Sequence, residues 1–546
     1  MLKNKPMNSK HTRNTLDRLV FDNQFIQQLP ADPESENYRR QVIKSCYSNV
    51  LPAKVSAPRM ISYSKEIAEQ LGVSATDCIS DQFSQVFVGN ELLPKMEPYA
   101  MCYGGHQFGH WAGQLGDGRA INLGEVVNTK KQRWALQLKG AGPTPYSRTA
   151  DGLAVLRSSI REFLCSEAMH HLGVPTTRAL SLILTGEQVV RDMFYDGHPK
   201  AEPGAVVCRV APSFTRFGSF QIYSARGDID LLRQFVDYTI SIDFPHLLNE
   251  QNSLGKGVYL QWFEEVCRIT AEMIVHWQRV GFVHGVMNTD NMSIMGLTID
   301  YGPYGWLDDY DPDWTPNTTD ASERRYRYSQ QPEIALWNLV QLANAIYPLI
   351  EQVEPLQQAL KIYSQTFDER WNAMMADKLG FEKFNPESDG AIFAELLVLL
   401  AEVETDMTVF YRNLAFLDIE CVDLTDKQLL EPVLEAWYRL DALNDDYKER
   451  FVSWMRKYIL RLQKAGVKQS DKTQRMNKVN PKYVLRNYLA QLAIDKAELG
   501  DYSLVNELLD VMRNPYEEQP HKVEYAVKRP EWARNKAGCS KLSCSS

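Results

Sequence analysis

Two carboxylates and one amide are the side chains of this chain best suited to chemistry. Asp290 and Asn291 end the segment Phe282-Val283-His284-Gly285-Val286-Met287-Asn288-Thr289-Asp290-Asn291, and Asp300 opens Asp300-Tyr301-Gly302 shortly afterwards. Magnesium prefers oxygen ligands and commonly takes one or two protein side chains together with substrate phosphates. The pattern therefore predicts Asn291 and Asp300 as ligands of a metal that binds with a nucleotide triphosphate.

The spacing of this segment is that of the catalytic loop and metal-binding turn of protein kinases, with one difference. Kinases use His-Arg-Asp-x-x-x-x-Asn, where the Asp orients the substrate hydroxyl and the Asn holds a metal. His284 and Asn291 keep this spacing, but Val286 occupies the position of the kinase aspartate. Asp290 is the only carboxylate left in the loop, so the usual kinase base is missing. His284 is expected to be structural.

A lysine at the end of a predicted strand is a candidate phosphate ligand. Residues 134–139 alternate between apolar and polar, and Lys139 ends this strand at a glycine-rich turn. A helix predicted over about 153–172 follows, and either Glu162 or Glu167 could pair with Lys139 as a kinase glutamate does. The spacing does not choose between them, and a solvated edge lysine with exposed glutamates is the ordinary alternative.

Glycines and arginines in neighbouring segments suit the same ligand. The glycines of 113–118 would let backbone N–H groups approach phosphate oxygens, although a tight hairpin turn explains them as well. Arg209 lies in a predicted strand over 206–210, and Arg216 follows it. Two arginines at the join between strands and helices suit capture of a triphosphate, whereas an isolated pair would more often form surface salt bridges.

The secondary-structure pattern changes along the chain from strands to helices. It predicts an N-terminal extension over 1–98, a strand-rich lobe with the nucleotide-binding loop over 99–211, and a mainly helical lobe with the catalytic loop over 212–350. A helical region over 351–512 and a flexible tail over 513–546 follow. The predicted fold class is α+β: a two-lobed, protein-kinase-like fold with mainly helical additions at both ends.

Composition narrows the range of partners. The 546 residues are 44% hydrophobic and 24% charged, as in ordinary globular proteins. A net charge of −9 argues against broad binding to nucleic acid or membrane surfaces, and no apolar run approaches the ~20 residues that span a bilayer. The 9 scattered cysteines favour a reducing, cytoplasmic compartment over a secreted disulfide framework. A basic leader before Asp17 leaves a mitochondrial transit peptide open, but we favour a frayed terminus.

Several long motifs together resemble one family. They are Tyr103-Gly104-Gly105-His106-Gln107-Phe108-Gly109-His110-Trp111, Gln114-Leu115-Gly116-Asp117-Gly118-Arg119-Ala120, Leu138-Lys139-Gly140-Ala141-Gly142 and Pro145-Tyr146-Ser147-Arg148, together with the loop and turn described above. This set resembles the selenoprotein O family, also called the YdiU family, from about Phe21 to the C-terminal cysteines.

The resemblance implies a fold and an activity. Members of that family have a pseudokinase fold and transfer AMP from ATP to Ser, Thr or Tyr hydroxyls of proteins, and some transfer UMP with manganese. They bind ATP in a flipped orientation, so that the α-phosphorus meets the acceptor. A differently placed nucleotide needs a differently placed base, which would account for Val286 in the kinase position.

The resemblance also implies residue roles. Asp290 would be the proton acceptor, and Asn291 and Asp300 would bind Mg²⁺ or Mn²⁺. Lys139 and Glu162 would form the ion pair, which selects Glu162 over Glu167. The nucleotide-binding positions would be Gly116, Gly118, Arg119, Asp151, Gly152, Arg209 and Arg216, with Asp300 contributing through the metal. An ordinary kinase and an inactive nucleotide-binding scaffold are the alternative functions.

The sequence also leads to predictions for the C-terminal cysteines and for an acidic run. Many family members end in a closely spaced cysteine or selenocysteine pair, whereas Cys539 and Cys544 are further apart here. We expect both thiols to be accessible and to form a redox-sensitive element, with two unpaired surface cysteines as the alternative. The acidic run from Asp308 to Asp313 is expected to be a solvated loop rather than a metal site.

Overall fold

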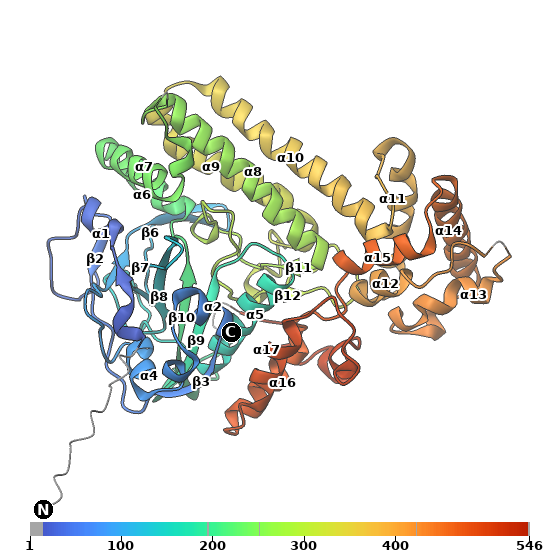
Figure 1. Cartoon of the computed structure of the whole chain (residues 1–546), viewed down its shortest axis with the longest axis horizontal. Helices are drawn as coiled ribbons and strands as arrows, with labels where there is room; N and C mark the ends of the chain where they lie inside the picture. Colours follow the sequence, from blue (N-terminus) through green and yellow to red (C-terminus); the bar gives the residue numbers. More distant parts are fainter. Residues whose placement is uncertain (1–14, 194–195, 251, 422, 544–546) are drawn as a thin grey trace, which may run out of the picture.

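The computed structural model describes residues 15–193, 196–250, 252–421 and 423–543. The basic leader up to residue 14 and Cys544 lie outside the described residues. The described chain is a mixed α/β structure with one large antiparallel sheet and many helices (Figure 1). In this part of the chain, no helix combines the length and apolar character needed to cross a membrane.

The large sheet has eight strands and places its central strand, β8, beside the candidate site. The strand order is β2-β4-β7-β8-β10-β9-β3, and β1 also pairs with β7. The bounds are β1 Val20–Phe21, β2 Tyr47–Asn49, β3 Arg59–Tyr63, β4 Tyr99–Met101, β7 Ala120–Val127, β8 Arg133–Lys139, β9 Arg178–Arg191 and β10 Lys200–Ala211.

The register of the sheet aligns a row of polar side chains. Gln137 on β8 lies opposite Asn122 on β7 and Arg209 on β10, while Lys139 ends β8 two residues further on. Successive residues of a strand point to opposite faces, so Gln137 and Lys139 share a face while Leu136 and Leu138 occupy the other. This confirms the alternation predicted for the lysine strand.

Helix α5 (Leu156–His171) packs against β9 and β10 and carries Glu162. The sequence predicts an apolar stripe, but α5 is buried nearly all round. The reason lies far along the chain: α16 (Asn487–Glu498) and α17 (Ser503–Met512) cover the side of α5 that does not face the sheet. Polar groups on α5 are consequently held in a largely water-free environment.

A helical part follows the sheet and carries the predicted catalytic loop. It contains α6 (Phe217–Arg226), α7 (Ile229–Asp243), α8 (Lys256–Val280), α9 (Gln331–Ile350) and α10 (Val353–Leu379). The loop begins at β11 (Phe282–Val283), which pairs with β12 (Gly305–Trp306), and ends in a 3₁₀ turn over Thr289–Asn291. β11 lies between α8 and the loop, and β12 follows the Asp300 turn. Their pairing therefore holds the loop and the turn together near the end of α8.

The helices of 351–512 are divided between two hydrophobic cores. The end of α10 packs with α11 (Pro386–Glu402), α12 (Met407–Leu414), α13 (Asp426–Leu430), α14 (Asp445–Lys464) and α15 (Gln469–Val479) around a core of their own. These helices form the group at the right of Figure 1. The next two helices, α16 and α17, return to the main core beside α5.

The tail is packed on the body as far as Ser543, contrary to the expectation of a loose segment. Leu542 is fully buried and forms a parallel bridge with Asn317, whose side chain donates to the Gly285 carbonyl of the catalytic loop at 3.0 Å. Cys539 is 2% exposed, and burial raises its thiol pKa to about 11. The expectation of an accessible thiol is therefore wrong for Cys539.

The acidic run is also not simply a solvated loop. The Asp308 side chain is largely buried, lies 3.3 Å from Arg486 and 3.7 Å from Arg529, and has a pKa that burial raises to about 6. Arg486 in turn pairs with the buried Asp406 at 2.8 Å. Asp308 thus belongs to an ion network that joins the segment after the predicted catalytic loop to the helical region and the tail.

Candidate active site

Lys139 and Glu162 form an ion pair at the end of β8, with 2.7 Å between Nζ and Oε2. Both side chains are buried, and burial lowers the pKa of Lys139 while Glu162 favours its charged form. Glu167 lies on another side of α5, where it accepts from Arg178 at 2.6 Å and from the Ser64 hydroxyl at 2.6 Å. The geometry therefore pairs Lys139 with Glu162, the choice that the spacing left open.

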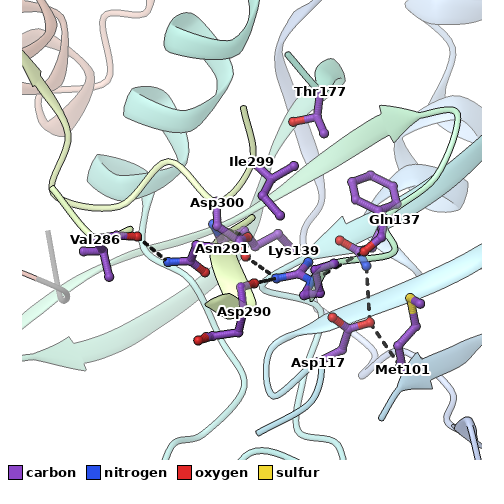
Figure 2. A network of polar contacts seen from close by, with 12 residues as sticks. Met101, Asp117, Gln137, Lys139, Thr177, Val286, Asp290, Asn291, Ile299 and Asp300 are labelled. Atoms are coloured by element: carbon purple, nitrogen blue, oxygen red, sulfur yellow. Dashed lines mark hydrogen bonds and ion pairs between the residues drawn. The ribbon is translucent and has the colours of Figure 1, made fainter. Parts of the chain in front are cut away.

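Asp300 joins this pair to both arginines. Its Oδ1 lies 2.5 Å from Arg209 and its Oδ2 lies 2.5 Å from Arg216, while Lys139 Nζ is 3.8 Å from Oδ1. Arg209 also reaches Glu162 at 3.1 Å. Three cations and two carboxylates give the cluster a net charge of +1. The cluster, part of which is drawn in Figure 2, can therefore accept further negative charge, as a triphosphate would supply.

The backbone turns at Asp300 to place its carboxylate between the arginines. Its φ of 55° lies in the left-handed region, which Asp tolerates better than most residues. Although burial opposes ionisation, Arg216, Arg209 and Lys139 hold the pKa of Asp300 well below its usual value. The preceding residue is anchored by His284, whose ring forms a 2.8 Å hydrogen bond with the Ile299 carbonyl. His284 thus has the expected structural contact.

Arg216 connects the turn to the catalytic loop. The nitrogen that contacts Asp300 also donates to the Asp290 carbonyl at 2.8 Å. Asn291 follows directly, and its Nδ2 donates to the Val286 carbonyl at 3.0 Å, which leaves its Oδ1 available (Figure 2). Asn291 and Asp300 thus offer a donor set made only of oxygen atoms. This set fits Mg²⁺ or Mn²⁺, which bind with phosphate oxygens.

Asp290 has one carboxylate oxygen held by a hydrogen bond and one without a hydrogen-bond partner among the described residues. Its Oδ2 accepts from Gln107 Nε2 at 3.2 Å, whereas its Oδ1 is buried and has no hydrogen-bond partner among the described residues. Burial raises the pKa of Asp290 to about 6, against the attraction of Arg216. A buried, unsatisfied carboxylate oxygen is costly, so its presence marks a place where a ligand hydroxyl could bind.

A hairpin that the sequence analysis did not assign to the site holds Asp290 in place. It consists of β5 (Gly104–Gln107) and β6 (His110–Gln114). Besides the Gln107 bond, the His106 backbone N–H donates to Thr289 Oγ1 at 2.7 Å. Gly105 allows the close approach, because a Cβ there would lie 2.7 Å from Asp290 Oδ1. The signal available in the sequence was the motif Gly104-Gly105-His106-Gln107, which carried the resemblance but no assigned role.

Gly116 and Gly118 of the predicted nucleotide loop are needed for close packing. Gly116 has φ of 79°, and a Cβ on it would lie 2.4 Å from the Tyr146 ring; a Cβ on Gly118 would lie 2.9 Å from the Tyr146 carbonyl. Between them, the buried Asp117 accepts from Gln137 at 3.3 Å, and Gln137 accepts from Arg209. Asp117 and Gln137 therefore support Arg209, a role that sequence reasoning missed.

The other predicted nucleotide-binding residues differ in their placement. Arg119 is partly exposed, and its carbonyl accepts from Gly140 N–H at 2.7 Å, directly after Lys139. Gly152, with φ of 76°, packs on the same turn, where its carbonyl accepts from Gly142 at 3.1 Å. Asp151 is not brought into the cluster, because its exposed carboxylate binds Arg191 with two contacts of 2.7 Å.

Comparison with known proteins identifies the family of this chain. The family model described as "Protein adenylyltransferase SelO" matches residues 34–513. The chain belongs to this family. It is 60% identical over 536 residues to the protein nucleotidyltransferase YdiU of Rhodopirellula baltica, covering 97% of this chain and 99% of that protein. It is 59% identical over 532 residues to the YdiU protein of Aromatoleum aromaticum, with the same coverage. The resemblance predicted from the motifs is confirmed.

Proposed function

We propose that this protein transfers AMP from ATP to Ser, Thr or Tyr hydroxyls of other proteins, in a two-lobed pseudokinase site that binds the nucleotide in a flipped orientation. UTP with Mn²⁺ is proposed as a second donor, on the family resemblance alone, and a reducing, cytoplasmic compartment on the cysteine composition. The observation that carries the proposal is the buried Asp290 oxygen that lacks a hydrogen-bond partner among the described residues, beside the cationic cluster of Lys139, Arg209 and Arg216.

The charges of the cluster suit the leaving group. The acceptor oxygen bonds to the α-phosphorus as the bond to the β-phosphate bridge breaks, and pyrophosphate leaves. Lys139, Arg209 and Arg216 are placed to balance the negative charge of the departing phosphates, which is the main task of a protein in phosphoryl-type transfer. A metal held by Asn291 and Asp300 would supply additional positive charge at the phosphates.

The buried Oδ1 of Asp290, which lacks a hydrogen-bond partner among the described residues, suits the proton transfer. In this proposal Oδ1 accepts the proton of the attacking hydroxyl, while Gln107 holds Oδ2 and fixes the direction of the carboxylate. Such general-base help is worth roughly 10²–10⁴-fold in rate. Val286 cannot act as the base, since its side chain is apolar and its carbonyl serves only to hold Asn291.

The position of the retained label tests the proposal against its two alternatives. The purified protein is incubated with Mg²⁺, an acceptor protein mixture and ATP labelled at either the α- or the γ-phosphorus. We expect label on protein only from α-labelled ATP, because AMP is the transferred group. Retention from γ-labelled ATP alone would identify a kinase, and ATP binding without any retained label would identify an inactive scaffold.

Replacing Gln107 tests how Asp290 is positioned. Gln107→Met keeps the length of the side chain but removes the donor, so we expect kcat to fall about tenfold, the value of one hydrogen bond to a charged group. The dissociation constant for ATP should stay unchanged, because Gln107 does not contact the cationic cluster. Gln114→Met, on β6 of the same hairpin, controls for loss of an amide that holds the hairpin without touching Asp290, because Gln114 bonds to Arg40, Val42 and Arg226 instead. Equal kcat values for Gln107→Met and the parent would refute the positioning role.

A further inference from the structure

A cavity of about 240 Å³, lined by none of the residues of the proposed active site, lies where the last turns of α10 meet α11 and α12 (Figure 1). Side chains from α8 and from the segment between Tyr310 and Pro332 complete its walls. Its volume is a little below the ~300–1,000 Å³ of most small-molecule sites, so it suits a compact ligand. We call it the α10 cavity.

One wall of the α10 cavity consists of aromatic rings. Phe367 and Trp371 on α10 stack with their centroids 5.8 Å apart and their planes at 17°, and Phe393 on α11 meets Trp371 edge-on at 6.1 Å. We call these three rings, all only partly buried, the aromatic wall. Met374 and Met375, whose side chains adapt to the shape of a ligand, also line the cavity. Such a lining favours an aromatic ring as the body of the ligand.

Three tyrosines line the α10 cavity. Tyr328 donates to the Gln278 carbonyl at 2.8 Å, whereas the hydroxyls of Tyr310 and Tyr411 make no hydrogen bond to any residue that the structure describes. Tyr411 is only 3% exposed, and buried hydroxyls are normally paired. Burial raises the pKa of Tyr310 to about 12 and also raises that of Tyr411, so both hydroxyls stay protonated and can donate. They therefore indicate a ligand with an acceptor group.

A buried lysine next to Tyr411 indicates that this acceptor is an anion. Lys378 Nζ donates to the Arg279 carbonyl and to Asn480 Oδ1, both at 3.0 Å, and lies 4.0 Å from the centre of the Tyr411 ring. Burial and the charge of Arg279 lower the pKa of Lys378, and no carboxylate within the described ranges pairs with it or lines the cavity. Buried lysines are rarely left without an anionic partner. A carboxylate bound in the cavity would favour the charged form of the lysine.

We propose that the α10 cavity binds a compact aromatic carboxylic acid. The ring of the ligand lies against the aromatic wall, and its carboxylate accepts hydrogen bonds from Tyr310 and Tyr411 beside Lys378. This inference goes beyond the proposed function and does not depend on it, because none of these residues takes part in the proposed transfer of AMP.

The first experiment compares three matched ligands on the full chain without nucleotide. 2-Naphthoate is the probe, 2-naphthamide keeps its shape without the charge, and decahydro-2-naphthoate keeps the charge without the aromatic rings. Ligand-observed NMR titrations measure the dissociation constants. For a ligand of its size, we expect 2-naphthoate to bind with a dissociation constant below about 1 mM. The amide should bind about tenfold more weakly, the value of a hydrogen bond to a charged group, and the saturated acid about fivefold more weakly.

Variants test whether the probe lies in the α10 cavity. Tyr411→Phe removes a hydroxyl that has no partner in the described part of the chain, so the melting temperature should stay unchanged while 2-naphthoate binds about tenfold more weakly. Tyr347→Phe removes the hydroxyl of a tyrosine on α9 that is 43% exposed, and this control should bind like the parent. Leu397→Trp enlarges a half-buried side chain of the lining and should weaken the binding of all three ligands.

Three results would overturn the proposal. They are a dissociation constant for 2-naphthoate well above about 1 mM, equal affinity for the acid and the amide, and parental binding by both Tyr411→Phe and Leu397→Trp. Equal affinity for decahydro-2-naphthoate would refute the aromatic body of the ligand. All these measurements are of binding in the absence of ATP, so their failure is distinct from a failure of the proposed transferase activity.

Discussion

Asp290→Asn should slow AMP transfer by about 10²–10⁴-fold while leaving the dissociation constant for ATP and metal nearly unchanged. The amide keeps the shape of the side chain and can still contact Gln107, but it cannot take up the proton of the acceptor hydroxyl. Because the contacts of Arg216 are to the Asp290 backbone and to Asp300, the cationic cluster should stay intact.

Single-turnover kinetics with α-labelled ATP and isothermal titration of a non-hydrolysable analogue measure the two quantities separately. Asp311→Asn, which makes the same change of charge in the nearby acidic run, is the control and should behave like the parent. A parental rate for Asp290→Asn would show that Asp290 is only a loop residue and would remove the general base from the proposed reaction.

Asp300→Asn, unlike Asp290→Asn, should weaken metal-dependent nucleotide binding and also lower the stability of the fold. The substitution removes the proposed metal ligand and leaves Arg209 and Arg216 buried with one carboxylate fewer. We expect the free energy of unfolding to fall by about 3 kcal/mol, the lower end for a broken buried ion pair, since the Asp300 side chain is 21% exposed.

Urea unfolding at neutral pH measures the loss of stability in Asp300→Asn. The dissociation constant for ATP, with and without Mg²⁺, measures the loss of metal-dependent nucleotide binding. The arginines hold the pKa of Asp300 below its unfolded value, so its stabilising effect is fully present above that value and disappears as pH falls through the folded pKa. Asp151→Asn breaks an exposed pair with Arg191 and should cost at most about 1 kcal/mol. An equal cost for both variants would contradict the assigned network.

The features that could be predicted from the sequence are those encoded by short local patterns. Asp290, Asn291 and Asp300 lie within one loop and one turn, so their order along the chain is enough to predict a metal and phosphate site. The alternation of β8 likewise predicted which face carries Lys139. Such patterns depend on strand geometry and loop spacing, which neighbouring residues determine.

Contacts between distant segments could not be predicted in this way. Gln107 and Asp290 are 183 residues apart, and Asp308 and Arg486 are 178 residues apart. The choice between Glu162 and Glu167 depends on how α5 is rotated against the sheet, and Arg178 on β9 settles it by binding Glu167. The tail was misjudged because its polar composition hides single anchors such as Leu542.

The bridge from Leu542 to Asn317 has a consequence for biosynthesis. Asn317 holds the Gly285 carbonyl, so a segment made long after the loop supports the loop that carries Asp290. Domains generally fold from the N-terminus during translation, and a nascent chain would lack this support until Leu542 has left the ribosome. A chain released before Leu542 is added would thus keep most of the fold described above but have an unsupported loop.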